Sequence, residues 1–579
     1  MRASRITSTR SAPETGSAAP SLSSGDRWLP LLLVVAALSL GWNLGGHRLL
    51  DPDEGRNAEV AREMALTNDY LVPHLDGLPY LDKPIVYFAA AAATMEIFGP
   101  TETAARLPAY LATLLTIALV VWFARRRWGA NAGWVAGIAL ATMPMVLAYA
   151  RTTIFDSTLA LFTTAAILCF AENRPVLAWA AIGAGALTKG PIAILIPLAT
   201  VVPYAWLVGE RLRSYFPWRG LAVFGLVALP WFLAVTARIP TFPHYVFVRE
   251  TFERVTTPSF HRTAPFWYYL PILPVAAFPW IVPVLARLGG GRVKWAWHAR
   301  RVNLAARDPI LLACWMLGPL VFFMLNQSKL PQYVLPLMPA FALAAARALT
   351  LNGLASGWKT LAGTAVALAV ALFTMPLWLP PASHLTAAVV AAIPPTARAI
   401  AVALLASAAL VALAVRRLDL TLAVAGYAVV VLAIPLVGAD LLRAVGEDRS
   451  AAALADAVRG RAVLAVSAYP PSLPFYLQRQ VPVATAHGRE LTSNFIADYV
   501  DEYRAVPGSP LLPADAWQTV LAECREPTVF VTRPVDRHVR EALAFLPMLF
   551  QNERYVAFGP CTPSPPQVPP LRHGEGNGG

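Results

Sequence analysis

The chain has 579 residues, of which 57% are hydrophobic and 14% are charged. A soluble domain usually carries about 25% charged residues, so this composition excludes a soluble protein and predicts a chain that lies mostly in lipid. The net charge of +13 does not indicate nucleic-acid binding, because the basic residues lie in short loops between apolar runs, as the positive-inside rule expects.

Apolar runs long enough to cross a bilayer recur from residue 28 to residue 440. Residues 1–27 are rich in Ser, Thr, Ala and Pro and predict a disordered cytoplasmic leader. The run 28–45 has the length of a retained anchor rather than of a cleaved signal peptide. We expect an α-helical polytopic membrane domain over residues 28–440 with about 13 spans, at 28–46, 105–124, 131–149, 157–172, 176–189, 191–209, 219–238, 266–286, 308–325, 333–350, 358–379, 385–415 and 419–440.

The distribution of basic residues predicts the orientation of the chain. The stretch 84–99 begins with a proline and carries Glu96 near its end, so it fits an interfacial helix better than a span. The connection 287–307 and the arginines at 125–127 then fall on the cytoplasmic side with the N-terminus. The C-terminal tail and four polar segments share the external, periplasmic face: residues 47–104, the turn after residue 149, residues 239–265 and residues 326–332.

From residue 441 the composition changes to an alternation of helix and strand patterns. Residues 461–469, 527–534 and 554–560 read as strands, which predicts a small α/β domain over residues 441–561. The Pro- and Gly-rich end, 562–579, is expected to be disordered. Cys524 and Cys561 lie in this tail; an oxidising compartment favours a disulfide between them, and two unpaired thiols are the open alternative.

The charged motif DPDEGR directly follows the first expected span. Asp51 or Asp53 is well placed to cap a helix that runs from Glu54 to Met64. A capped, solvated amphipathic helix is therefore one interpretation of the motif. The other interpretation is a functional site on the external face.

A second external motif places Tyr80, Asp82 and Lys83 before the start of the interfacial helix. A lysine at a helix N-terminus is unfavourable unless an anion lies there, because the helix dipole makes that end positive. Lys83 and Arg56 on one external loop have the chemistry to bind a phosphate. Lipid headgroups are the alternative partner of Lys83.

Asp156 lies between two expected spans, near the external interface. A carboxylate close to the hydrocarbon is costly, which makes it a functional candidate. The alternative is that it caps a helix beginning at Ser157. Lys189 also lies near a membrane boundary, where snorkelling of its side chain is a sufficient explanation.

Two later external segments add further polar groups. His261 and Arg262 precede an aromatic cluster, which by itself is most simply an interfacial belt. Lys329 and Tyr333 lie in the last external segment. A mixture of carboxylates and phosphate-binding cations on one membrane face suits the transfer of a group away from a lipid phosphate.

The motifs DPDEGRNAEVAREM, TIFDS, FHRTAPFWYYLP and SKLPQYVLPLMP occur in the order found in a known family. Over roughly residues 28–350, the chain resembles the aminoarabinose (4-amino-4-deoxy-L-arabinose) transferases and the related protein O-mannosyltransferases. These are GT-C-fold glycosyltransferases that use polyprenyl-phosphate sugars. The external α/β tail also resembles the aminoarabinose-transferase branch.

The resemblance implies catalytic roles for Asp53 and Asp156. It implies an inverting transfer from a polyprenyl-phosphate sugar to lipid A or another envelope acceptor, at the periplasmic face of the bacterial inner membrane. Some relatives hold a divalent metal, zinc or magnesium, between positions that match Asp82 and His261. The implied donor-phosphate ligands are Arg56, Lys83, Arg262 and Tyr333, with weaker substrate contacts at Glu54, Tyr80, Lys189 and Lys329.

Two other functions remain open at the level of sequence. A protein O-mannosyltransferase shares the Asp–Glu motif, although the tail shows no repeated sugar-binding module. A transporter of lipid-linked sugars would be expected to show repeated halves with broken helices near the membrane midplane, whereas the unusual charges here gather in external loops. The sugar, the acceptor and the oligomeric state are not readable from the sequence.

Overall fold

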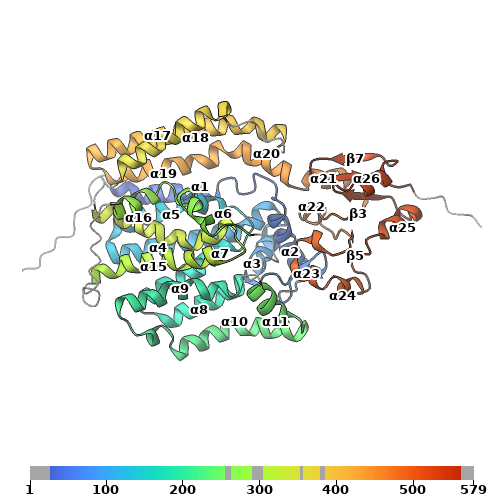
Figure 1. Cartoon of the computed structure of the whole chain (residues 1–579), viewed down its shortest axis with the longest axis horizontal. Helices are drawn as coiled ribbons and strands as arrows, with labels where there is room; N and C mark the ends of the chain where they lie inside the picture. Colours follow the sequence, from blue (N-terminus) through green and yellow to red (C-terminus); the bar gives the residue numbers. More distant parts are fainter. Residues whose placement is uncertain (1–25, 254–262, 290–303, 353–356, 379–384, 563–579) are drawn as a thin grey trace, which may run out of the picture.

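The computed structural model describes residues 26–253, 263–289, 304–352, 357–378 and 385–562. A bundle of apolar helices forms one end of the molecule and a small sheet-containing domain forms the other (Figure 1). The helices of the bundle are α1 (Leu29–Gly41), α4 (Glu102–Trp128), α5 (Ala130–Ala141), α6 (Pro144–Ala150), α7 (Asp156–Ala171), α8 (Pro175–Lys189), α9 (Ile192–Val208), α10 (Trp218–Arg238), α13 (Tyr269–Ala276), α14 (Ile281–Gly289), α15 (Leu304–Leu325), α16 (Met338–Asn352), α17 (Trp358–Trp378), α18 (Ala387–Arg417) and α19 (Leu420–Val437).

The bundle confirms the predicted α-helical, polytopic membrane architecture. Every expected span coincides with a helix or with a bent pair of helices. Seven helices in the described part of the chain are long and apolar enough to cross a membrane, or up to nine if each bent pair is one span. The pairs α5–α6 and α13–α14 bend by 64° and 111°. Helices α1, α7 and α9 are apolar but shorter, so the count of about 13 crossings stays a prediction.

Helices α2 (Asp53–Thr67) and α3 (Val86–Phe98) lie between the bundle and the C-terminal domain (Figure 1). A short hairpin of β1 (His74–Leu75) and β2 (Leu78–Pro79) connects them. Helix α2 is polar in composition, yet all of its residues from Glu54 to Met64 are buried. The interpretation of this motif as a solvated surface helix is therefore wrong. The tertiary structure covers both faces of α2, which local sequence cannot reveal.

The C-terminal domain is a six-stranded mixed sheet with short helices around it. The strand order is β5-β4-β3-β6-β8-β7; the first four strands are parallel, and β8 runs antiparallel to β6 and β7. The structure thus confirms a small α/β domain after the membrane helices. Its strands are β3 (Ala462–Val466), β4 (Val483–Ala484), β5 (Leu511–Leu512), β6 (Thr528–Thr532), β7 (Met548–Gln551) and β8 (Val556–Phe558).

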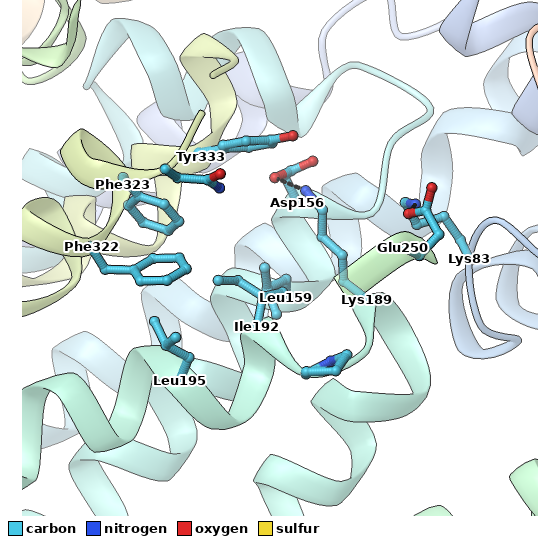
Figure 2. A pocket seen from close by; sticks show the side chains of 12 residues that line it. Lys83, Asp156, Leu159, Lys189, Ile192, Leu195, Glu250, Phe322, Phe323 and Tyr333 are labelled. Atoms are coloured by element: carbon cyan, nitrogen blue, oxygen red, sulfur yellow. Dashed lines mark hydrogen bonds and ion pairs between the residues drawn. The ribbon is translucent and has the colours of Figure 1, made fainter. Parts of the chain in front are cut away.

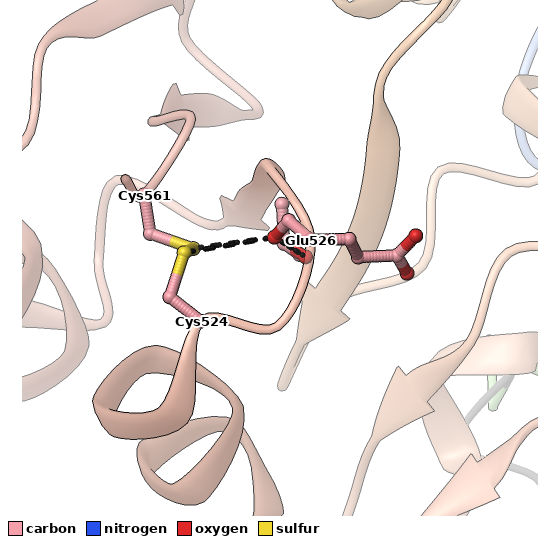
Figure 3. The surroundings of a disulfide bond; sticks show 4 residues. Cys524, Glu526 and Cys561 are labelled. Atoms are coloured by element: carbon pink, nitrogen blue, oxygen red, sulfur yellow. Dashed lines mark hydrogen bonds between the residues drawn. A yellow bond between two sulfur atoms is a disulfide. The ribbon is translucent and has the colours of Figure 1, made fainter. Parts of the chain in front are cut away.

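Short helices complete this domain and join it to the bundle. Helix α20 (Ala439–Arg449) leads out of α19 into the domain. Cys524 and Cys561 form a disulfide with a Cα–Cα distance of 6.0 Å (Figure 3). Of the two alternatives left open by the sequence, a disulfide or two unpaired thiols, the structure has the disulfide. The other helices are α21 (Ala452–Val458), α22 (Leu473–Leu477), α23 (Asn494–Asp498), α24 (Val500–Arg504), α25 (Ala516–Glu523) and α26 (Arg537–Leu543).

The C-terminal domain docks on α2 and α3 through one continuous hydrophobic cluster. Val60 and Met64 of α2 belong to the same cluster as Leu473 and Phe475 of α22. Polar contacts accompany the cluster: the Ser472 hydroxyl donates to Asp51 Oδ2 at 2.8 Å. Burial of apolar area of this kind is the main source of stability in such an interface. The sheet domain and helices α2 and α3 therefore form one packed unit.

Asp51 gives this docking a pH dependence. Burial raises the pKa of its carboxyl from 3.8 to about 7, whereas the hydrogen bond from Ser472 and the charge of Arg554 oppose the rise. The charge of Glu54 adds to the rise. The folded protein therefore keeps a proton that the unfolded chain releases, so this contribution to stability is complete below pH 3.8 and is lost as the pH rises through about 7.

We expect the thermal midpoint of the wild-type protein to fall between about pH 5 and pH 8, and the Asp51→Asn variant to show a flatter profile over that range. Thermal unfolding in detergent, with proteolysis of the C-terminal domain as a second readout, measures both profiles. Asp456→Asn on the exposed face of α21 is the matched control. A variant profile as steep as that of the wild type would contradict the assignment.

Candidate active site

A cavity of about 210 Å³ lies where the loops predicted to be external meet the ends of the bundle helices (Figure 2). Four charged side chains and two polar ones face it from five different parts of the chain. The opposite wall is apolar and is built mainly from α9 and α15. The polar lining is Lys83, Asp156, Lys189, Glu250, Asn326 and Tyr333, and the apolar lining is Leu159, Pro191, Ile192, Leu195, Phe322 and Phe323.

The first ion pair of the cavity joins two neighbouring helices. Asp156 is the first residue of α7 and Lys189 is the last residue of α8, and the two helices pack against each other. The Lys189 Nζ lies 2.5 Å from Asp156 Oδ1 and 5.0 Å from the centroid of the Tyr333 ring. An acidic group at a helix N-terminus and a basic group at a C-terminus both match the helix dipoles.

The positions of both residues argue against the purely local explanations, and their functional roles stay predictions. Asp156 begins the helix itself rather than capping one that starts at Ser157. Lys189 points at a carboxylate inside the cavity, as Figure 2 shows, and its side chain is 14% exposed. Snorkelling toward lipid headgroups therefore does not describe its position.

The second ion pair joins Lys83 to Glu250. Lys83 Nζ lies 3.2 Å from Glu250 Oε2, with side chains 17% and 10% exposed. Lys83 also donates to the backbone carbonyl of Asp82. Glu250 lies on the π-helical segment η3 (Tyr245–Glu253), and the Asn494 amide donates to its Oε1 at 3.0 Å. Sequence reasoning missed Glu250, whose one signal was its position in an external segment.

Asp53 and Arg56 form a third pair at the start of α2, outside the cavity lining. Arg56 Nη2 lies 2.6 Å from Asp53 Oδ1. Its Nη1 donates to the backbone carbonyl and the hydroxyl of Thr492, both at 3.0 Å, and the guanidinium lies 5.9 Å from the Tyr80 ring centroid. Arg56 therefore links the predicted catalytic carboxylate to the C-terminal domain.

Electrostatics connects this third pair to the cavity. Burial raises the pKa of the Tyr80 phenol, and the positive charge of Arg56 opposes this rise. Three carboxylates add to the rise through their negative charges: Asp82, Asp53 and Glu250. Asp53 and the cavity residue Glu250 thus act on the same phenol.

The helix capping predicted for this region is not formed as expected. The N-cap position of α2 is Pro52, which provides no side-chain hydrogen bond. Asp53 is the first residue of the helix, and Asp51 instead accepts from Ser472. The prediction that Asp51 or Asp53 caps the helix is wrong: Asp53 is already part of the helix, and the C-terminal domain, distant in sequence, supplies the partner of Asp51.

Glu54 is a structural anchor in this arrangement. Its carboxylate accepts from Arg106 Nε and Nη2, both at 2.9 Å. The backbone N–H groups of Thr153 and Leu50 donate to it at 2.8 and 3.0 Å. Arg106, a fully buried residue of α4 that sequence reasoning missed, also donates to the carbonyls of residues 44, 47 and 48. A charged residue inside an otherwise apolar span was its available signal.

Asp82 faces the C-terminal domain rather than the cavity. Its carboxylate accepts from the Tyr245 hydroxyl and from the backbone N–H groups of Asn494 and Phe495, the latter two at 3.1 and 2.9 Å. The proposed metal partner His261, like Arg262, lies outside the described residues. Within the described ranges, no group of three or more His, Cys, Asp or Glu side chains could hold a metal ion. Asp82 accepts three hydrogen bonds from protein groups, and the metal site that pairs it with His261 stays a prediction.

Lys329 belongs to the loop that forms one edge of the cavity. It is buried and donates to the backbone carbonyl of Asn326, whose side chain lines the cavity. Its role there is to hold the loop. Of the predicted site residues, the structure brings four to the cavity: Lys83, Asp156, Lys189 and Tyr333. Asp53 and Arg56 lie at the start of α2, where Tyr80 lies under the Arg56 guanidinium.

Comparison with known proteins bears on this site. A family model described as dolichyl-phosphate-mannose-protein mannosyltransferase matches residues 82–233. An undecaprenyl phosphate-alpha-4-amino-4-deoxy-L-arabinose arabinosyl transferase of Yersinia enterocolitica is 33% identical over 327 residues, or 54% of this chain and 57% of the relative. The protein of the same name from Pectobacterium carotovorum is 32% identical over 375 residues, or 60% and 66%. The match thus spans less than two thirds of these relatives' length.

The fold is similar over a longer range. The crystal structure of ArnT from Cupriavidus metallidurans bound to undecaprenyl phosphate has a TM-score of 0.81 and 26% identity, covering 94% of this chain and 100% of that one. The apo structure of the same protein gives 0.78 and 27%, covering 93% and 98%. These similarities confirm two predictions. One is the resemblance that the motifs indicated, and the other is the helical GT-C fold with a small C-terminal α/β domain.

Proposed function

We propose that this chain, an aminoarabinose-transferase-like GT-C protein in sequence and fold, is an integral-membrane glycosyltransferase. It moves aminoarabinose or a related sugar from a polyprenyl-phosphate donor to lipid A or another envelope acceptor. The observation that carries the proposal is the composition of the cavity. Lys83 and Lys189 face an apolar wall that includes Phe322 and Phe323, which suits a ligand with a charged phosphate and a hydrocarbon tail.

Binding of the donor phosphate is assigned to the cations around the cavity. Lys83 acts as a point charge that faces the cavity. Lys189 and Tyr333 face the same space. Arg56 and Arg262 are the proposed bidentate ligands of a phosphate.

The reaction breaks the bond between the anomeric carbon and a phosphate oxygen, and forms a bond from that carbon to an acceptor oxygen with inversion. Negative charge then develops on the leaving polyprenyl phosphate, where fixed cations stabilise the transition state. If the acceptor is a hydroxyl, Asp53 takes its proton as general base. If the acceptor is a phosphate, Asp53 orients it or the sugar. Asp156 holds Lys189 in place.

The proposed location is the bacterial inner membrane, with the cavity and the C-terminal domain on the periplasmic side. Two observations support this orientation. The arginines at 125–127 lie in the last turn of α4, whose first turn holds Glu102, the partner of Arg48 in the first predicted external segment; the positive-inside rule favours the cytoplasm for the arginine-rich end. The disulfide between Cys524 and Cys561 favours an oxidising compartment for the C-terminal domain.

A protein O-mannosyltransferase is the second candidate function. The observation in its favour is the family model that matches residues 82–233. Such an enzyme would take its sugar from a polyprenyl-phosphate mannose and use a protein hydroxyl as acceptor. A transporter of lipid-linked sugars is the third candidate.

We expect the purified protein to transfer sugar from undecaprenyl-phosphate aminoarabinose to lipid A, seen by mass spectrometry as a gain of one sugar residue. Parallel incubations offer polyprenyl-phosphate mannose with peptide acceptors. Mannose transfer to the peptides would favour the second candidate. Absence of transfer from every donor, together with movement of a lipid-linked sugar across vesicles, would favour the transporter.

A further inference from the structure

We propose that an apolar groove on the outside of the helix bundle binds one anionic phospholipid. The groove lies between α1, α4 and α5, which pack against one another (Figure 1), and has a volume of about 500 Å³. It runs toward the arginine-rich end of α4, whereas the other end of this helix holds Glu102, which accepts from the Tyr476 hydroxyl of the C-terminal domain at 3.2 Å. The proposal therefore concerns a site away from the cavity and goes beyond the proposed transfer.

The groove has the length of one leaflet of the bilayer. It follows α4 from Leu114 to Arg125, and the rise of 1.5 Å per helical residue makes this about 16 Å. Half of a hydrocarbon core of about 30 Å is about 15 Å. Besides Arg125, the lining is aliphatic or tryptophan, and Val34 of α1 and Trp122 of α4 are 53% and 41% exposed. The acyl chain of a phospholipid in one leaflet therefore matches the groove in length and polarity.

Arg125 supplies a positive charge where this leaflet meets its headgroups. Its guanidinium lies 4.5 Å from the centroid of the Trp134 ring, which also lines the groove. Its two neighbours both pair with Glu172, Arg126 at 2.9 Å and Arg127 at 2.8 Å. Among the described residues, no carboxylate pairs with Arg125 itself. A guanidinium suits a phosphate as a bidentate donor, and basic residues at the membrane surface attract anionic lipids.

A glycine of α5 gives the Arg125 side chain its place. A Cβ on Gly133 would lie 1.9 Å from Arg125 Cγ and 2.9 Å from its Cδ, so the stem of the arginine occupies the space that the missing side chain leaves. The next residue, Trp134, meets the guanidinium. An arginine that only reaches toward headgroups needs no such space. The packing of α4 on α5 thus fixes the cation at the end of the groove.

A photoreactive lipid tests the proposal on the full-length protein. Phosphatidylglycerol or phosphatidylcholine with a diazirine on its acyl chain is mixed into phosphatidylcholine vesicles that hold the purified protein, and mass spectrometry locates the cross-links. We expect the phosphatidylglycerol probe to label residues 33–37 and 114–122 about fivefold more than the phosphatidylcholine probe. This factor is typical of one arginine beside an anionic headgroup.

Two variants and a control separate this site from ordinary contact with lipid. Arg125→Gln should lower the ratio of the two probes to about one. Trp134→Leu keeps the charge but removes the ring that holds it, and should give an intermediate ratio. Arg126→Gln removes the neighbouring arginine, which is 60% exposed and paired with Glu172, and should keep the fivefold ratio. A thermal midpoint verifies the fold of each variant.

Each other outcome overturns the proposal in its own way. Equal labelling of the groove by the two probes in wild type, or a ratio that Arg125→Gln leaves unchanged, would mean ordinary surrounding lipid. Displacement of the probe by undecaprenyl phosphate would assign the groove to a polyprenyl lipid. Absence of labelling would mean that a protein segment or a second copy of the chain covers it. The comparison of probes in wild type needs no variant, so it decides even where Arg125→Gln fails to fold.

Discussion

Replacement of Asp53 by Asn is expected to lower the rate of sugar transfer by about 10²- to 10⁴-fold, the usual contribution of a positioned general base. Asn keeps the size of the side chain and can still accept the hydrogen bond from Arg56, which the carboxylate now receives at 2.6 Å. It cannot take a proton from an acceptor hydroxyl. The loss should therefore appear in kcat while the fold and donor binding persist.

The measurement is steady-state transfer with separate values of kcat and KM, accompanied by a thermal midpoint to verify folding. Asp440→Asn is the matched control, since Asp440 forms the same type of i,i+3 pair with an arginine at an exposed site of α20. A loss in KM alone would assign Asp53 to orienting the substrate. Near-normal activity would remove Asp53 from the catalytic group altogether.

Arg106→Met is expected to give the largest loss of stability, about 3 to 5 kcal/mol. Arg106 and Glu54 are 0% and 1% exposed and form a paired set of hydrogen bonds between α4 and the start of α2. Removal of the guanidinium leaves the Glu54 charge buried without its cation. It also releases the backbone carbonyls of residues 44, 47 and 48. The start of α2, and with it Asp53, should lose its fixed position.

Thermal and denaturant unfolding in detergent measure this loss. The double variant Arg106→Met, Glu54→Gln should recover part of it, because the uncompensated charge is then absent. Arg126→Met, which breaks an exposed ion pair to Glu172, serves as the control and should cost at most about 1 kcal/mol. A loss for Arg106→Met as small as that of the control would show that the buried pair is not a main support of the site.

The membrane part of the fold could be predicted from the sequence because its signal is local. A run of apolar side chains must lie in lipid as a helix, since each backbone polar group has to find its partner within the segment. The helices α4, α10, α17 and α18 accordingly lie at the expected spans. The alternation of strand and helix after residue 441 likewise predicted the small sheet domain. Breaks within spans, as between α5 and α6, were missed because hydropathy does not register a bend.

The candidate residues could be identified in part for a similar reason. A carboxylate near hydrocarbon is costly, so Asp156 stood out, and a lysine at a helix N-terminus pointed to Lys83. Lys189 had snorkelling as a sufficient local explanation, and the resemblance of the motifs gave Asp53 its catalytic role. Glu250 lies in a polar external segment where a carboxylate is ordinary. Its importance depends on what it faces, and the sequence contains no information of that kind at one position.

By itself, then, the sequence determined that the chain is a helical membrane protein with polar loops between its spans, an α/β tail and motifs that resemble those of a transferase family. The tertiary structure alone decided which charges meet. Glu54 pairs with Arg106 across 52 positions, Lys83 with Glu250 across 167, and Asp51 with Ser472 across 421. The physical reason is that hydropathy and its periodicity are properties of neighbouring residues, whereas an ion pair depends on how helices and domains pack. The same packing makes α2 a buried support instead of a solvated helix.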